Sequence, residues 1–192
     1  MPTEWIVVVP FRMASAKSRF GPHDNSALAL AMALDTVEVA LTVAQVIVVT
    51  DAPQPFLALG AAVHPDPGTG LNAAIEAGLA QAGIDPGRAV LLGDHPALTP
   101  EELAESLAAA IHPLSMVADS AETGTAMTLA LPGVSHHPVF GGGSKAAHES
   151  AGYRPLVGDW PGLRADVDTA ADLARLERTG PRTSAWSAGS SR

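Results

Sequence analysis

The sequence predicts an α/β domain with three layers, in which helices cover both faces of a mainly parallel β-sheet. Short apolar runs rich in β-branched residues alternate along the chain with longer stretches rich in alanine and leucine, which is the pattern of strands alternating with helices. The runs are apolar throughout, as expected for strands buried on both faces. Neither a repeat nor a linker interrupts this alternation, so we expect a single domain over residues 1–179.

Five apolar runs predict the strands of this sheet. The first, WIVVVP, consists largely of β-branched residues and ends at a proline, which is typical of a buried strand. The expected strands cover residues 5–10, 46–50, 88–94, 115–119 and 125–131. Because ligands bind at the carboxyl ends of parallel strands, the residues that follow these runs are the candidates for a functional site.

Composition and start signals predict the helices. Thr99 is a suitable N-cap, because a proline follows it at the first helical position and two glutamates complete the first turn. The expected helices cover residues 26–44, 70–83, 99–111, 143–152 and 169–180. We expect the long apolar helix over 26–44 to lie in the core, with the face of a homodimer as the alternative. The Ser- and Gly-rich residues 180–192 are predicted to form a flexible tail.

Composition also limits the classes of function. The chain has 192 residues, of which 47% are hydrophobic and 16% are charged, as in a globular domain with a real core. Its net charge of −9 argues against binding to nucleic acid or to an anionic membrane. The chain has no cysteine, which excludes disulfides and thiolate chemistry. The N-terminus has no pattern of a signal peptide or membrane span, so we expect a cytoplasmic protein with small-molecule partners.

Positive charge is concentrated in the loop that follows the first predicted strand. Arg12, Lys17 and Arg19 are three of the eleven lysines and arginines, and they fall within eight positions. Cations on flexible side chains suit the oxygens of a triphosphate. The alternative is a solvated surface loop without a ligand.

Two glycine-rich segments indicate sites where backbone N–H groups contact an anion. In PDPGTGLNAA, Gly70 allows close approach at a helix start, and the amide of Asn72 is suited to a base edge. In FGGGS, the residues from Gly141 to Ser144 offer successive N–H groups to a phosphate or carboxylate. The alternatives are a loop-to-helix junction and a flexible turn. His148 adjoins the second segment, and its role stays open.

Three aspartates are candidates for a metal site. Asp94 directly follows the apolar run AVLLG, where a carboxylate must be paired or bound to a metal. Asp166 and Asp168 are two residues apart, so both would face one side of an extended segment. Oxygen ligands without cysteine indicate Mg²⁺ rather than zinc. The alternatives are a turn aspartate at Asp94 and a helix cap at Asp168 or Thr169.

Several segments together resemble a known family. In chain order they include VVPFRMASAKSRF, PDPGTGLNAAIEAG, GDHPALTPEEL, FGGGSKAAH and PGLRADVDTAADL. This set resembles the guanylyltransferase family of deazaflavin coenzyme F(420) biosynthesis, which is similar to the MobA-type nucleotidyltransferases. The resemblance extends from about residue 5 to residue 178. It implies the Rossmann-like αβα fold of the MobA-like nucleotide-diphospho-sugar transferases.

The resemblance also implies an activity. The family transfers GMP from GTP to a phosphorylated three-carbon acid and releases pyrophosphate. The acceptor would be phosphoenolpyruvate or 2-phospho-L-lactate. The resemblance favours phosphoenolpyruvate, because the Ala- and Gly-rich chain looks like the high-GC bacterial branch of the family. A downstream deazaflavin transferase would be a further partner.

Carried over position by position, the resemblance implies a role for each candidate residue. The Mg²⁺ ligands would be Asp94, Asp166 and Asp168. The residues at the acceptor's phosphate and carboxylate would be Thr125, Gly141 and Ser144. The residues at GTP would be Arg12, Lys17, Arg19, Gly70 and Asn72, with Lys17 also a catalytic residue.

The chain departs from the family pattern at some positions of the ligand loops. Arg12, Ala126 and Val139 stand where lysine, threonine and arginine are usual. Two other functions therefore stay open. One is a catalytically silent nucleotide-binding homologue, and the other is a MobA-like transferase with a different phosphorylated acceptor, such as a molybdopterin or a sugar phosphate.

Overall fold

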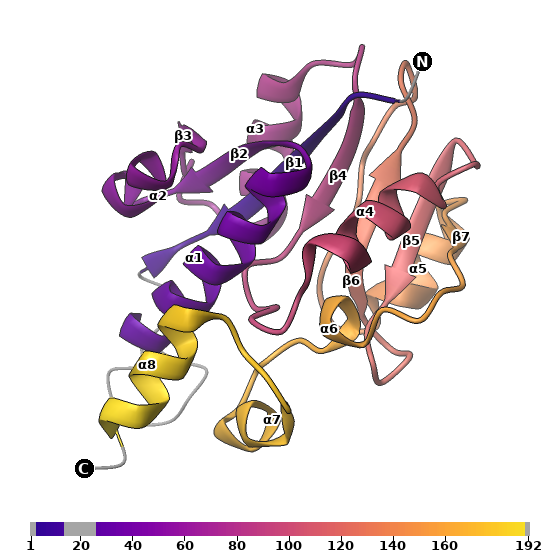
Figure 1. The fold of residues 1–192 in the computed structure, drawn as a ribbon. Helices are drawn as coiled ribbons and strands as arrows, with labels where there is room; N and C mark the ends of the chain where they lie inside the picture. Colours follow the sequence, from indigo (N-terminus) through magenta and orange to yellow (C-terminus); the bar gives the residue numbers. More distant parts are fainter. Residues whose placement is uncertain (1–2, 14–25, 191–192) are drawn as a thin grey trace.

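The computed structural model describes residues 3–13 and 26–190, and within these residues seven strands form one sheet (Figure 1). The strands are β1 (Trp5–Phe11), β2 (Gln45–Thr50), β3 (Ala62–Pro65), β4 (Gly87–Leu91), β5 (Leu114–Ala118), β6 (Thr125–Ala130) and β7 (Arg154–Pro155). Their order across the sheet is β3-β2-β1-β4-β6-β5-β7. β3, β2, β1 and β4 are parallel, β6 is antiparallel to both neighbours, and β7 is parallel to β5. The predicted α/β class with a mainly parallel sheet is confirmed.

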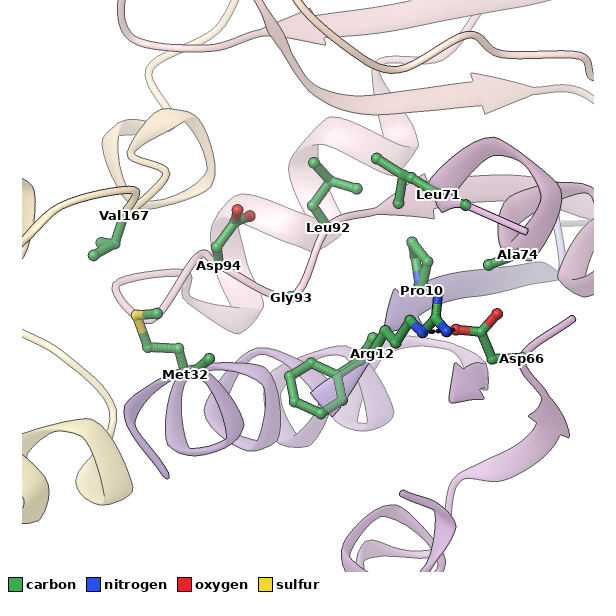
Figure 2. A pocket seen from close by; sticks show the side chains of 13 residues that line it. Pro10, Arg12, Met32, Asp66, Leu71, Ala74, Leu92, Gly93, Asp94 and Val167 are labelled. Carbon is green, nitrogen blue, oxygen red and sulfur yellow. Dashed lines mark ion pairs between the residues drawn. The ribbon is translucent and has the colours of Figure 1, made fainter. Parts of the chain in front are cut away.

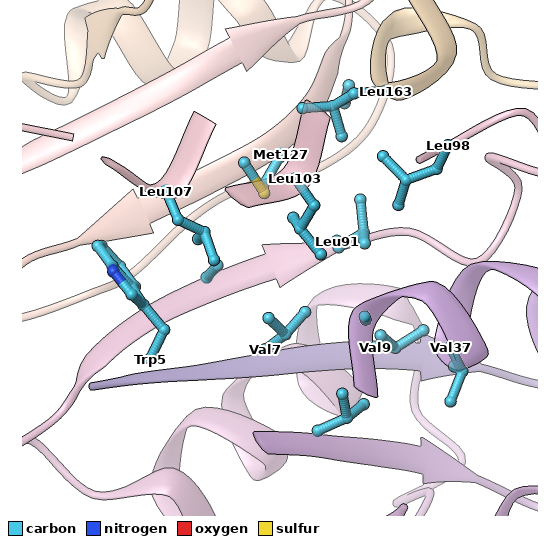
Figure 3. Packing of buried hydrophobic residues seen from close by; sticks show 14 of the residues in the cluster. Trp5, Val7, Val9, Val37, Leu91, Leu98, Leu103, Leu107, Met127 and Leu163 are labelled. Atoms are coloured by element: carbon cyan, nitrogen blue, oxygen red, sulfur yellow. The ribbon is translucent and has the colours of Figure 1, made fainter. Parts of the chain in front are cut away.

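Helices pack on both faces of this sheet. They are α1 (Ser26–Val43), α2 (Pro53–Leu59), α3 (Leu71–Ala82), α4 (Pro100–Ala108), α5 (Ser144–Ser150), α6 (Pro161–Arg164), α7 (Ala170–Arg175) and α8 (Pro181–Ser190). Val7 and Val9 of β1 lie in one hydrophobic cluster with Val37 of α1 and Leu103 of α4 (Figure 3). Val8 points to the opposite face and packs with residues of α3. Because side chains alternate along a strand, β1 contacts helices on both faces of the sheet, and the three predicted layers are present.

The long helix α1 lies in the core. Its length and hydropathy are those of a candidate membrane span, but it packs against β1, β2, α4 and α8. Ala33, Val37 and Ala40 are fully buried there. The prediction of a core helix is therefore confirmed.

The C-terminal segment differs from the prediction. Residues Pro181–Ser190 form α8, which packs along α1 (Figure 1). The buried carboxylate of Asp35 on α1 accepts hydrogen bonds from the backbone N–H groups of Arg182 at 3.1 Å and Thr183 at 2.9 Å. The Arg182 guanidinium also forms ion pairs with Asp35 and Glu38. Because of these contacts, the predicted flexible tail is wrong for Pro181–Ser190.

Candidate active site

A pocket opens at the carboxyl ends of β1 and β4 (Figure 2). Its walls come from the end of β1, the start of α3 and the segment after β4, and residues of α1 and the segment after α6 complete the lining. Most lining residues are apolar, and the charged groups come from Arg12, Asp66 and Asp94. Gly70 also lines the pocket. The structure thus brings together two of the predicted nucleotide-binding residues and one of the predicted metal ligands.

Arg12 holds the loop before α3, over residues 66–70, in place. Its Nη1 donates to the carbonyl oxygen of Gly68 at 3.2 Å, and its Nε lies 3.6 Å from Oδ2 of Asp66 (Figure 2). The Asp66 side chain, which is 5% exposed, also accepts a hydrogen bond from the Gly68 N–H at 2.7 Å. An anion in the pocket would therefore meet a cation whose position is already fixed. Lys17 and Arg19 of the same basic loop lie outside the described residues, so their roles stay predictions.

The start of α3 forms one wall of the pocket. Gly70 directly precedes this helix and has a φ of +121°, a conformation that side chains of other residues disfavour. The N–H groups of the first helical turn have no partner within the helix. Such a helix start suits an anion, as the sequence predicted for Gly70.

Asn72, in the same turn, has another set of partners. Its Nδ2 donates to the carbonyl oxygen of Phe140 at 3.1 Å, and its Oδ1 accepts from the Phe140 N–H at 2.9 Å. These two hydrogen bonds join α3 to the glycine-rich loop over 139–143. The Asn72 side chain therefore supports this loop, and its predicted contact with guanosine stays a prediction.

Asp94 leaves β4 toward the pocket (Figure 2). Gly93 before it lies against Ala33 of α1, because a Cβ at Gly93 would lie 3.1 Å from the Cβ of Ala33. Asp94 Oδ1 lies 3.6 Å from Nε2 of His95, whose side chain is fully buried. The carbonyl oxygen of Asp94 accepts a hydrogen bond from the N–H of Val167 at 3.0 Å. This backbone bond holds the segment with the two other aspartates beside Asp94.

The three predicted metal ligands share one electrostatic environment. Burial raises the pKa of Asp166 above its ordinary value, and the negative charges of Asp94 and Asp168 raise it further. Among the residues that the structure describes, however, no three His, Asp or Glu side chains are arranged to hold a metal ion. The aspartates are neighbours without being a preformed metal cage. Thr169 rather than Asp168 caps α7, since its side chain accepts the N–H of Asp172.

The three predicted acceptor-binding residues form a cluster at the same edge of the sheet. β6 begins at Thr125, and the pairing of Leu91 with Met127 places that start beside the segment leading to Asp94. Ser144, at the start of α5, donates from Oγ to Oγ1 of Thr125 at 3.2 Å. The Ser144 N–H donates to the carbonyl oxygen of Gly141, also at 3.2 Å. The structure thus places Thr125 beside Ser144, and the binding of an acceptor by Thr125, Gly141 and Ser144 stays a prediction.

His148, for which the sequence predicts no role, contacts this cluster. It is 1% exposed. Its Nδ1 lies 2.9 Å from Oγ1 of Thr125, and its Nε2 accepts the N–H of Val139 at 3.0 Å. Burial lowers the pKa of His148 to about 4. Ser144 and His148 are four residues apart on one helix, a spacing that puts two side chains on the same face.

Comparisons with known proteins relate this chain to a family. Residues 12–171 match the model of the MobA-like NTP transferase domain. A protein of Salinispora arenicola named phosphoenolpyruvate guanylyltransferase is 48% identical over 202 residues, which cover 95% of this chain and 93% of the relative. A protein of the same name from Geodermatophilus obscurus is 44% identical over 98% of this chain and 96% of the relative.

A solved structure supports the same relationship at the level of the fold. It comes from Desulfovibrio desulfuricans G20 and is described as a nucleotide-diphospho-sugar transferase. It matches 98% of this chain and 96% of its own with a TM-score of 0.69 at 16% identity, and so confirms the predicted fold type. The chain therefore belongs to the MobA-like NTP transferase family, and within it to the group of relatives named phosphoenolpyruvate guanylyltransferase.

Proposed function

We propose that this protein transfers GMP from GTP to phosphoenolpyruvate and releases pyrophosphate. The observation that carries the proposal is that two groups of residues suited to anions lie at one edge of the sheet. The first group lines the pocket and includes Arg12 and the start of α3. The second group is Thr125 and Ser144, whose hydroxyl groups are hydrogen-bonded to each other. The names of the relatives support phosphoenolpyruvate as the acceptor.

The reaction joins two phosphates. An oxygen of the acceptor phosphate attacks the α-phosphorus of GTP, and the bond from that phosphorus to the β-phosphate breaks, so that pyrophosphate leaves. The acceptor phosphate is already ionised at neutral pH, so the protein needs no nucleophile of its own. The side chains hold two anions in line. Arg12 faces the triphosphate, and Thr125, supported by Ser144, faces the acceptor.

We propose that the carboxylates of Asp94, Asp166 and Asp168 bind a divalent cation together with the phosphates of the substrates. Burial and the nearby negative charges raise the pKa of Asp166. A bound cation would stabilise the ionised carboxylate and so lower this pKa. Mg²⁺ is usually held by one or two carboxylates together with substrate phosphates. We therefore expect these aspartates to share it with the phosphates of GTP. Bound there, Mg²⁺ would offset the charge of the reacting and leaving phosphates.

The proposal extends to the setting of the enzyme. The product is a reactive mixed diphosphate, and the sequence resemblance to the coenzyme F(420) family supports its use by a downstream deazaflavin transferase. We propose a cytoplasmic enzyme, in keeping with the small anionic substrates.

The test is the release of pyrophosphate from GTP in the presence of phosphoenolpyruvate, 2-phospho-L-lactate or 3-phosphoglycerate, with and without Mg²⁺. We expect Mg²⁺-dependent release with phosphoenolpyruvate and slower release with 2-phospho-L-lactate. A methyl-scale difference in a pocket wall is worth only about 1–3 kcal/mol. Release with 2-phospho-L-lactate alone would overturn the acceptor assignment. No release with any acid would favour a catalytically silent nucleotide-binding homologue.

A further inference from the structure

The tautomer of His148 follows from its hydrogen bonds. Its Nε2 lies 3.0 Å from the backbone nitrogen of Val139. A backbone N–H can only donate, so Nε2 accepts and carries no proton. A neutral imidazole has one N–H, which must then be on Nδ1. The ring is buried between Phe140 and Tyr153, and this burial favours the neutral form.

The Nδ1–H of His148 acts on the hydroxyl of Thr125. Nδ1 lies 2.9 Å from Oγ1 of Thr125 and therefore donates to it. Ser144 Oγ donates to the same oxygen at 3.2 Å. A hydroxyl has two lone pairs and one hydrogen, so these two bonds occupy both acceptor positions of Thr125. The hydrogen of the Thr125 hydroxyl is then directed to a third partner.

We propose that His148 is a positioning residue, which makes the Thr125 hydroxyl an obligate hydrogen-bond donor to an anionic oxygen of the acceptor. Phosphate and carboxylate oxygens accept and do not donate, so a hydroxyl fixed as a donor selects for them. With the other tautomer, Thr125 would donate to the ring of His148 and lose this contact. The inference rests on the proposed function, since it deepens the role of Thr125 in acceptor binding.

The glycine-rich loop determines which tautomer is present. The Val139 N–H that fixes Nε2 as an acceptor belongs to the segment whose next residue, Phe140, is held by Asn72. The same loop thus carries Gly141 to the acceptor cluster and sets the proton of His148. The position of the loop therefore determines, through the imidazole ring of His148, whether the Thr125 hydroxyl donates or accepts.

The first test measures the tautomer directly in the wild-type protein. Two-bond ¹⁵N–¹H NMR spectra of histidine-labelled protein at pH 7 distinguish a ring protonated at Nδ1 from one protonated at Nε2. The signal of His148 is identified by its loss in His148→Gln. We expect the Nδ1–H tautomer, and the Nε2–H tautomer would overturn the proposal. This result does not depend on turnover, so it stays separate from a failure of the proposed function.

The second test uses two substitutions, each of which replaces only one of the two ring nitrogens of His148 by an amide group. His148→Asn puts an amide N–H near the position of Nδ1, whereas His148→Gln reaches the position of Nε2 and can accept only the Val139 N–H. We expect His148→Gln to raise the KM for phosphoenolpyruvate about tenfold or more over the wild type. His148→Asn should keep most of the wild-type affinity for phosphoenolpyruvate. The KM for GTP should stay within about threefold in both. The reverse order, with glutamine tolerated and asparagine not, would show that His148 only anchors the loop.

Two further variants complete this test. His136→Gln is the matched control, because His136 is also a buried histidine beside Tyr153 but contacts Thr128 instead of Thr125. It should leave the KM for phosphoenolpyruvate unchanged. Thr125→Val should raise that KM as much as His148→Gln does, and the double variant should be no worse than Thr125→Val alone. Additive effects in the double variant would overturn the proposal, because the two residues would then act separately.

Discussion

Replacement of Asn72 by alanine should loosen the glycine-rich loop over 139–143 while the domain stays folded. The variant removes both hydrogen bonds to Phe140, at 3.1 Å and 2.9 Å. Each contributes about 1 kcal/mol net, so closure of the loop loses about 2 kcal/mol. At about 1.4 kcal/mol for a factor of ten, the opening equilibrium shifts about 30-fold. The Phe140 side chain remains packed in the core beside α3, which limits the change to the loop.

Amide hydrogen exchange measures this shift at single residues. The Val139 amide is protected by His148 and the Ser144 amide by Gly141, so both should exchange about 30-fold faster in Asn72→Ala. The KM for phosphoenolpyruvate should rise, because Gly141 and Ser144 belong to the acceptor cluster. The KM for GTP should stay unchanged.

The matched control is Gln45→Ala. Gln45 is an exposed residue at the start of β2, and its amide donates to Glu4 at 2.7 Å. This variant should change neither the exchange of the loop nor either KM. If Asn72→Ala left the loop unchanged and raised the KM for GTP, the reasoning would fail. Asn72 would then contact the nucleotide, as the sequence predicted.

The buried histidines His136 and His148 should make the domain less stable in acid. Burial lowers their pKa values to about 3 and about 4. Their contribution to the free energy of unfolding is therefore fully present above pH 6.5, the ordinary pKa of histidine. It is lost as the pH falls toward 4, and the loss reaches up to about 2.7 kcal/mol per pH unit for the two histidines together. Urea denaturation between pH 7 and pH 4.5 tests this, and a flat profile would refute it. Asp35→Ala should lower the free energy of unfolding by about 3 kcal/mol, because two N–H groups at the start of α8 lose a charged acceptor; a loss below about 0.5 kcal/mol would show that α8 does not depend on this contact. Asp166→Asn should abolish turnover without destabilising the fold, because it removes one of several crowded negative charges; turnover at the wild-type rate would remove Asp166 from the mechanism.

Much of the fold could be predicted because its strands are long, apolar and β-branched. β1 and β2 are such strands, and the sequence predicts each to within one residue of its bounds, whereas the predicted strand over 88–94 extends three residues beyond the end of β4. β3 and β7 were missed, since β3 is a four-residue strand containing His64 and β7 has only two residues. The helix α2 was missed because it contains two prolines, although its first one fits a helix start. α8 was missed because its order depends on Asp35, which is distant in the sequence.

The candidate site was predictable where a residue directly follows a strand. Asp94 follows an apolar run, and its place at the pocket results from that position. The roles of Asn72 and His148 could not be predicted in the same way. Asn72 finds its partner 68 residues away, and His148 depends on Thr125, which lies 23 residues before it. Such partners are known only once the chain is folded, because no local pattern specifies them.

The most direct test of the proposed activity is the fate of the phosphorus atom of phosphoenolpyruvate. ³¹P NMR follows this atom while the protein is incubated with GTP, phosphoenolpyruvate and MgCl₂. We expect the phosphate monoester resonance to be replaced by two coupled diphosphate resonances, with pyrophosphate appearing in equal amount. Pyrophosphate with an unchanged phosphoenolpyruvate resonance would show hydrolysis of GTP instead, and would contradict the transfer of GMP to this acceptor.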